Sequence, residues 1–451
     1  MTQLARKLRL PDYFSLGWGT MVGVGWLVVM DDWLTRGGPL GGILGFAIGG
    51  VLLLPIGYVY GKLVMAMPDA AGEVAYTAKV FPPSVSFFTG WMMMLAYFIV
   101  CPWEAVAVGR IAGYIFPALD SIELYRVAGK PVYLPHLVIG LALTALVTVV
   151  NYRGIRLSAI FQNWTTFGTL ALFVIFVGIG VTRGSPANFP PLFTHTPLVS
   201  ILLVLQIVPY YMTGYESVTK LAEEANPEFR AGGFSRAIFA AIVVGAVFYI
   251  VVIAAVGFVA PWHSLTGVPF MTAVAFEHAI GSRWIVSIIL SAALLSLFKV
   301  FNGNFVAASG LLFAMGRRGL VDTRFAQVHP RNQTPSAAVA SVGFATAACM
   351  FLGSAILVPV SEVGSVASAT GWFAVCMAYM WMRPRALDLA ITGLGALVGT
   401  AMIMMKLLPM VPGSFSRWEW MSLALWIILG VGARRSSVEH NSLGNTPEEN
   451  S

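Results

Sequence analysis

The sequence predicts an all-α membrane protein with twelve transmembrane helices, and two observations support this fold class. Hydrophobic residues make up 58% of the 451 residues and charged residues only 10%, whereas a soluble domain carries about 25% charged residues. Apolar runs of roughly 20 residues, the length that a spanning helix needs, recur along the whole chain. We expect lipid to cover much of this apolar surface, because a soluble core could not hold all of it.

The expected spans lie between residues 13 and 435, which should form a single transmembrane domain. A short cytoplasmic segment, 1–12, precedes this domain, and a polar tail, 436–451, is expected to be disordered. In chain order, the twelve expected spans are 13–33, 40–60, 87–115, 134–151, 159–181, 198–220, 234–259, 284–315, 337–358, 363–382, 387–408 and 418–432.

The distribution of lysine and arginine predicts which side each loop faces, because cytoplasmic loops are enriched in both. With the N-terminus in the cytoplasm, 18 of the 27 basic residues fall in inside segments and 6 in outside segments. The other three, Arg110, Lys299 and Lys406, fall within spans. We therefore expect a bacterial-type cytoplasmic (inner) membrane protein with both termini in the cytoplasm. The net charge of +7 indicates topology rather than a nucleic-acid surface.

Enzymatic and ATP-driven functions find little support in the sequence. Cys101, Cys349 and Cys376 lie in apolar runs, which suits small core residues better than a disulfide framework or a metal site. The histidines show no metal-ligand spacing, and no phosphate-binding loop occurs. We expect no cofactor and no metal. No cleavable signal peptide is expected either, because the first apolar run lacks a small-residue cleavage site.

The first span contains a run of glycines, Gly17, Gly19, Gly23 and Gly25, that could interrupt the helix near mid-membrane. Unpaired backbone within a membrane is tolerated only where it lines a protected cavity. A break here would expose amides that attract a carboxylate and carbonyls that attract an ammonium group or Na⁺. Spacing alone supports close helix packing through small residues equally well.

The sixth span carries a second candidate interruption at Pro209 and Gly214. If spans one to five and six to ten form inverted repeats, the two interruptions occupy equivalent positions. Such a pair is the best sequence indication of a transporter binding site. The tyrosines Tyr210, Tyr211 and Tyr215 could line this site, and ordinary aromatic packing explains each of them as well.

Several motifs resemble those of the amino acid–polyamine–organocation permeases. They occur in order at 17–26, 67–76, 90–91, 214–227 and 307–335, and span the first ten expected helices. Three positions depart from the family pattern: Glu73 stands where glycine is usual, Gly310 where arginine is usual and Arg318 where aspartate is usual. The last two departures change the charges that the family usually carries at its inner gate.

The resemblance implies a leucine-transporter-like 5+5 inverted repeat with two peripheral C-terminal helices. It also implies alternating-access transport of a small amino acid or amine, with the substrate site between helices 1, 3, 6 and 8. The substrate carboxylate would bind backbone near Gly23, its ammonium group would bind carbonyls near Tyr211, and Glu104 and Tyr215 would shape selectivity. The expected substrate-binding residues are Thr20, Gly23, Val24, Gly25, Glu104, Tyr210, Tyr211, Thr213 and Tyr215.

Lys299 and Glu104 are ionisable groups within expected spans, which makes both functional candidates. Some proton-coupled relatives carry a lysine from helix 5 at a cation position, and helix 5 here has none. Our hypothesis is that Lys299 fills this position from helix 8 and couples transport to H⁺. The alternative is a static counter-ion for Glu104. Glu104 itself could accept a substrate ammonium group or pair with Lys299 or Arg110.

Three further acidic residues are candidates for gating. Asp31 and Asp32 are expected near the outer mouth, where they could attract cationic substrates or close a gate with Arg36, or simply end a helix in solvent. Glu216 is expected to organise the broken sixth helix. Other functions stay open at this point: a sensor or scaffold without turnover, a Na⁺-coupled or exchange-type amine or polyamine carrier, and a channel.

Overall fold

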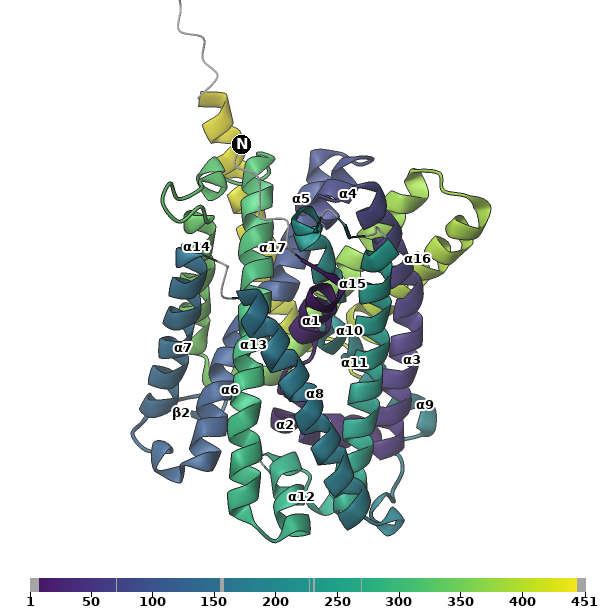
Figure 1. The fold of residues 1–451 in the computed structure, drawn as a ribbon, viewed down its shortest axis with the longest axis vertical. Coiled ribbons are helices and arrows are strands. Elements are labelled where there is room, and N and C mark those ends of the chain that lie inside the picture. Colours follow the sequence, from purple (N-terminus) through teal and green to yellow (C-terminus); the bar gives the residue numbers. More distant parts are fainter. Residues whose placement is uncertain are drawn as a thin grey trace, which may run out of the picture.

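The computed structural model describes residues 8–69, 71–154, 158–226, 228–229, 232–268 and 270–443. Across these residues the fold is a bundle of long helices running side by side, with one two-stranded hairpin (Figure 1). The elements are α1 (Leu10–Met21), α2 (Gly25–Val28), α3 (Met30–Ala66), α4 (Glu73–Ala78), α5 (Pro83–Phe98), α6 (Val100–Ile115), η1 (Pro117–Leu119), β1 (Glu123–Val127), β2 (Lys130–Tyr133), α7 (Leu134–Arg153), α8 (Ser158–Arg183), η3 (Pro186–Asn188), α9 (Pro197–Leu205), α10 (Val208–Met212), η4 (Tyr215–Glu224), α11 (Gly232–Val259), η5 (Trp262–Ser264), α12 (Met271–Ile280), α13 (Arg283–Arg317), η6 (Thr323–Ala326), α14 (Ser336–Met350), η7 (Gly353–Ile356), α15 (Leu357–Trp381), α16 (Ala386–Leu407) and α17 (Arg417–Leu443).

Eight helices of the described residues are long and apolar enough to cross a membrane. Two of the expected spans are interrupted and are present as shorter pieces. The span expected at 13–33 is divided among α1, α2 and the start of α3, and the span expected at 198–220 is divided among α9, α10 and η4. Both interruptions that glycine and proline predict are therefore present in the backbone.

Several other boundaries differ from those expected. α3 runs on into the second expected span and kinks at Gly38, whose positive φ of 66° only glycine adopts easily. The span expected at 87–115 is divided into α5 and α6, which meet at Ile99. α17 continues to Leu443, past the expected start of the tail, and 444–451 lie outside the described residues.

The two ends of the bundle carry different connections, and we name the ends after them. The hairpin end holds the antiparallel pair β1–β2 and the short helix α12, and the α4 end holds α4 (Figure 1). α1 lies in the middle of the bundle, where it contacts α8, α11, α13 and η4. This central position buries the interrupted segment on every side.

Candidate functional site

The first break separates α1 from α2 at residues 22–24. Val22 is extended, with φ −99° and ψ 104°, and the helix resumes after Val24. Within the described part of the chain, the backbone amides of Gly23, Val24 and Gly25 have no hydrogen-bond acceptor. Unpaired amides are costly in a buried setting unless a ligand or water accepts from them. The break therefore presents three donors to a partner of opposite polarity.

The second break lies at Thr213 and Gly214, and it touches the first. Gly214 has a φ of 134°, in the region that favours glycine. A Cβ atom on Gly214 would stand 2.7 Å from the backbone nitrogen of Met21 and 3.0 Å from the carbonyl carbon of Thr20. Backbone of the two interrupted helices is therefore in direct contact, which a larger residue at 214 would prevent.

Side chains of other helices already satisfy several carbonyls beside the breaks. The Tyr249 hydroxyl lies 3.2 Å from the carbonyl oxygens of both Met21 and Tyr211, and links the two broken helices. Asn304 donates to the carbonyl oxygen of Thr20 at 3.1 Å. Each carbonyl oxygen has two lone pairs, so each can still accept one further hydrogen bond.

The tyrosines of the sixth span do not all gather at one place. The Tyr211 ring lies 2.8 Å from the position of a Cβ atom on Gly25, so it faces the first break. Tyr210 packs against Gly364 of α15. Tyr215 lies nearer the α4 end than Tyr210 and Tyr211 do, and its ring contacts the rings of Tyr60 and Trp372. Of the three tyrosines, Tyr211 is therefore the one whose ring these contacts place at the first break.

Helix α15 supports the second break through two serines. Ser365 accepts a hydrogen bond from the Tyr210 backbone amide at 3.3 Å. The hydroxyls of Thr213 and Ser368 form a short hydrogen bond, and the Thr213 hydroxyl also lies 2.6 Å from the carbonyl oxygen of Pro209. The interrupted backbone is therefore fixed by a neighbouring helix rather than left loose.

Glu216 organises the second break from within the same segment. Its carboxylate accepts from the Gly214 amide at 3.1 and 3.2 Å and from the Tyr97 hydroxyl at 3.1 Å, and its side chain is fully buried. A carboxylate held by these donors stays beside the break and fixes the turn at Gly214. The Glu216 carboxylate therefore lies against the backbone of the second break.

Glu104 lies against the first break, and Lys299 lies against the preceding helix α1. Glu104 Oε1 stands 2.7 Å from the position of a Cβ atom on Gly23, and Lys299 Nζ lies 4.7 Å from the centre of the Trp18 ring. The side chain of Lys299 also reaches Gly19 of α1. Glu104 and Lys299 form no ion pair with each other, since no nitrogen–oxygen distance between them is within 4.0 Å. Glu104 Oε2 and Lys299 Nζ are both buried without a hydrogen-bond partner in the part of the chain described here.

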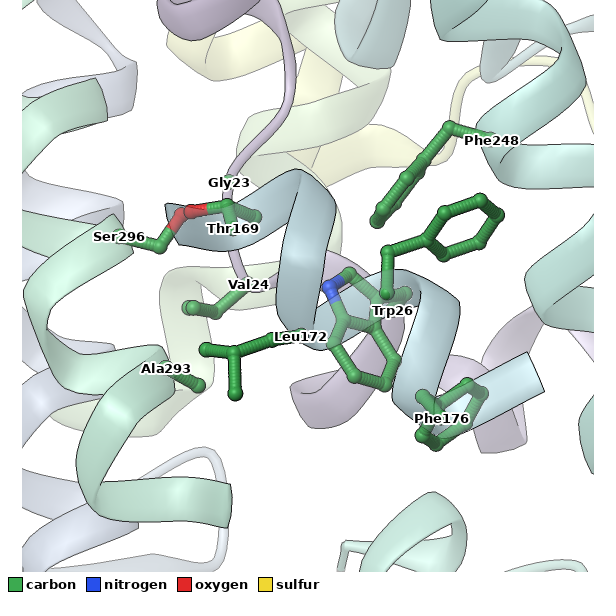
Figure 2. A pocket seen from close by; sticks show the side chains of 10 residues that line it. Gly23, Val24, Trp26, Thr169, Leu172, Phe176, Phe248, Ala293 and Ser296 are labelled. Atoms are coloured by element: carbon green, nitrogen blue, oxygen red, sulfur yellow. The ribbon is translucent and has the colours of Figure 1, made fainter. Parts of the chain in front are cut away.

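A small cavity borders the first break on the side of α8 and α13 (Figure 2). Rings of Trp26, Phe176 and Phe248 lie along one side, and Thr169 and Ser296 lie on the other. Its volume is about 20 Å³, which holds about one water molecule. An amino acid needs far more room, so the helices around the break are closed in this conformation.

Residues 8–433 match the family model described as amino acid permease. The chain belongs to the amino acid permease family. It is 24% identical to the "Methylthioribose transporter" of Bacillus subtilis (strain 168), over 95% of this chain and 92% of that protein. It is 25% identical to the "Branched-chain amino acid permease BcaP" of the same organism, over 86% of this chain and 83% of the relative.

The family assignment confirms the resemblance seen in the motifs. It also agrees with the expectation that this protein is not an enzyme, since the family and the similar proteins are permeases and transporters. Together with the eight apolar helices, the family makes the chain a multi-pass membrane protein. Among the described residues, no three His, Cys, Asp or Glu side chains gather closely enough to hold a metal ion.

A chain of charges connects three helices of this permease near the hairpin end. Asp32 pairs with Arg36 at 2.8 Å, Arg36 pairs with Glu362 of α15 at 2.7 Å, and Glu362 also pairs with Lys406 of α16. The sequence singled out Asp32 and Arg36 but missed Glu362 and Lys406. Their apolar flanks were the only signal: Lys406 is a lone charge within an expected span, and Glu362 stands directly before one.

Two ion pairs at the α4 end account for two departures of this permease from the family motifs. Buried Glu73 pairs with Lys220 and accepts from the Tyr60 hydroxyl at 2.9 Å. Arg318 pairs with Asp69 at 2.7 Å. The residues unusual for the family at 73 and 318 thus each have an oppositely charged partner, and the two pairs join Glu73 to η4 and Asp69 to the end of α13.

Proposed function

We propose that this permease is a secondary transporter that moves a small amino acid across the cytoplasmic membrane by alternating access. The observation that carries the proposal is the set of free amides at Gly23, Val24 and Gly25, directly beside a second broken helix. Buried donors without partners need an acceptor, and a substrate carboxylate supplies two oxygens. The printed names of similar proteins add support, since most refer to amino acids.

The opposite pole of the substrate has two candidate partners. Its ammonium group would donate to carbonyl oxygens of Tyr210, Tyr211 and Thr213, and to the Glu104 carboxylate beside Gly23. Because Glu104 Oε2 is buried without a hydrogen-bond partner among the described residues, an ammonium group would satisfy it. Thr20 contributes backbone at the contact between the breaks.

Alternating access requires the closed helices to separate at each end in turn. At the hairpin end, which we assign to the outside, opening needs only the Arg36–Glu362 link to break. Arg36 would stay paired with Asp32, and Glu362 would stay paired with Lys406, so no charge on either side of the opened link would be left unpaired. Asp31 lies beside this gate. At the α4 end, assigned to the cytoplasm with both termini, the pair Glu73–Lys220 would close the inner side.

We further propose that H⁺ drives transport through Lys299. An ammonium group buried without hydrogen-bond partners in the described structure is costly. Contact with Trp18 and Gly19 of α1 places the Lys299 side chain against the broken helix, so gain or loss of a proton there would change how α1 packs.

Two measurements test the proposal. A thermal-shift screen of purified protein against amino acids and amines identifies ligands, because binding stabilises the folded state by RT ln(1 + [L]/Kd). Counterflow in proteoliposomes then separates a carrier from a sensor. A transporter exchanges labelled ligand against an internal pool, and binding without any exchange would refute the transport function.

A further inference from the structure

A second and much larger cavity opens at the hairpin end. Its volume is about 420 Å³, within the range of roughly 300–1,000 Å³ that is usual for small-molecule sites. It lies between the end of α6, the β1–β2 hairpin, the start of α7 and the loop before α12. Its lining includes Arg110, Tyr114, Asp120, Lys130, Phe270 and Ser354.

The cavity wall presents two positive charges that no acidic group of the described residues neutralises by contact. Arg110 lies 5.1 Å over the Phe270 ring, and neither Arg110 nor Lys130 has an ion pair or a side-chain hydrogen bond among the described residues. The nearby Arg126 differs, because it pairs with Glu123 at 2.7 Å. The Arg126 side chain lowers the pKa of the Glu123 carboxyl through this hydrogen bond. Arg126 is therefore already satisfied, and it does not line the cavity.

A carboxylate faces the same space. Asp120 follows α6, and its Oδ1 lies 2.9 Å from His136 Nε2 at the start of α7. Half of the Asp120 side chain remains exposed, at 49%. The cavity thus offers a positive group, a negative group and the aromatic rings of Tyr114 and Phe270 within one enclosure. This combination complements a molecule that carries both charges and an apolar part.

The cavity is separate from the break between helices. Arg110 is six residues beyond Glu104 on α6, which is about 9 Å along the helix axis. The two regions are nevertheless linked electrostatically, because Arg110 attracts Asp31 as well as Asp120. A bound anion at Arg110 would weaken its attraction to Asp31, which lies in the first turn of α3.

We propose that this cavity is a second site for an amino acid in its zwitterionic form, outside the central site. The ligand carboxylate binds Arg110 and Lys130, its ammonium group binds Asp120, and its side chain lies against Tyr114 and Phe270. The amino acid as ligand class rests on the proposed function, whereas the existence of the site rests on the cavity and its charges.

The test measures protection of a cysteine placed in the cavity. Ser354→Cys is introduced after Cys101, Cys349 and Cys376 are replaced by alanine, and the protein is reconstituted in phosphatidylcholine nanodiscs. The maleimide labelling rate is then measured with each standard amino acid at millimolar concentration. A true ligand at four times its Kd slows labelling about fivefold, because the free fraction is 1/(1 + [L]/Kd). Arg110→Gln should abolish this protection, and the matched variant Arg126→Gln should keep it.

The outcomes separate this site from the proposed transport. Protection that depends on Arg110 supports the cavity site. If the wild-type protein also shows no counterflow, that second result refutes the proposed transport and leaves the cavity site supported. Counterflow without protection by any amino acid overturns the cavity site alone. Protection that survives Arg110→Gln also overturns it. Slow labelling in phosphatidylglycerol nanodiscs, with no effect of amino acids, would assign the cavity to a lipid headgroup and overturn the amino acid ligand.

Discussion

Replacing Gly214 by alanine tests the direct contact between the two broken helices. The new Cβ atom would stand 2.7 Å from Met21 N, and an ordinary contact of 3.4 Å would need a shift of about 0.7 Å. The φ of 134° adds strain of about 1–3 kcal/mol for a residue other than glycine. Overpacking against backbone adds about 1–3 kcal/mol. We expect a total loss of about 2–6 kcal/mol and a melting temperature several degrees below that of wild type.

Gly310→Ala is the matched control for this change. No atom lies within 4 Å of the position of a Cβ atom on Gly310, and the residue lies within helix α13. This variant should melt at or slightly above the wild-type temperature, since alanine favours a helix by up to about 1 kcal/mol over glycine. Both variants are measured by thermal melting in the same detergent, followed by counterflow. Equal melting temperatures for the two variants would refute the contact between the breaks.

Four further substitutions test the charges. Lys299→Ala should reduce uptake driven by a pH gradient at least tenfold while counterflow continues, and unchanged gradient-driven uptake would exclude the coupling role. Lys220→Ala leaves Glu73 buried and unpaired, which should lower the free energy of unfolding by about 3–5 kcal/mol. Arg318→Ala at the exposed pair should lower it by at most about 1 kcal/mol. Similar melting temperatures for these two variants would contradict this order. Glu216→Gln should cost about 1–3 kcal/mol by weakening charged hydrogen bonds at the second break, and a melting temperature equal to wild type would argue against its organising position.

Local sequence signals predicted those parts of the fold that depend on interactions between residues close together in the chain. Apolar runs located the helices, since lipid demands an apolar surface over a fixed length. The glycines of the first span and Pro209 with Gly214 predicted where backbone leaves the helix. The motifs predicted the family, which is confirmed. The kink at Gly38, where two expected spans join, and the division at Ile99 were missed. The sequence around them does not distinguish this glycine or this apolar residue from the many others in the chain.

Contacts between helices distant in sequence could not be predicted from the chain alone. Tyr249 is one tyrosine within an apolar run, and nothing local indicates that its hydroxyl links Met21 to Tyr211. Glu362 and Lys406 find each other across two helices for the same reason. The substrate-binding positions stay predictions: the Tyr211 ring faces the first break, whereas the Tyr215 ring packs against Tyr60 and Trp372.

The central claim is that the two breaks bind opposite poles of one zwitterion, and competition in counterflow tests it most directly. The amino acid with the strongest exchange is compared with its methyl ester, its N-acetyl derivative and methylthioribose. The ester lacks the carboxylate for the amides of Gly23 to Gly25, and the N-acetyl form lacks the ammonium group for Glu104. Each should compete at least about tenfold less well, since a lost charged hydrogen bond costs about 1.5–3 kcal/mol. If the ester and the N-acetyl form compete as well as the parent amino acid, the breaks do not recognise its charges and the claim is wrong.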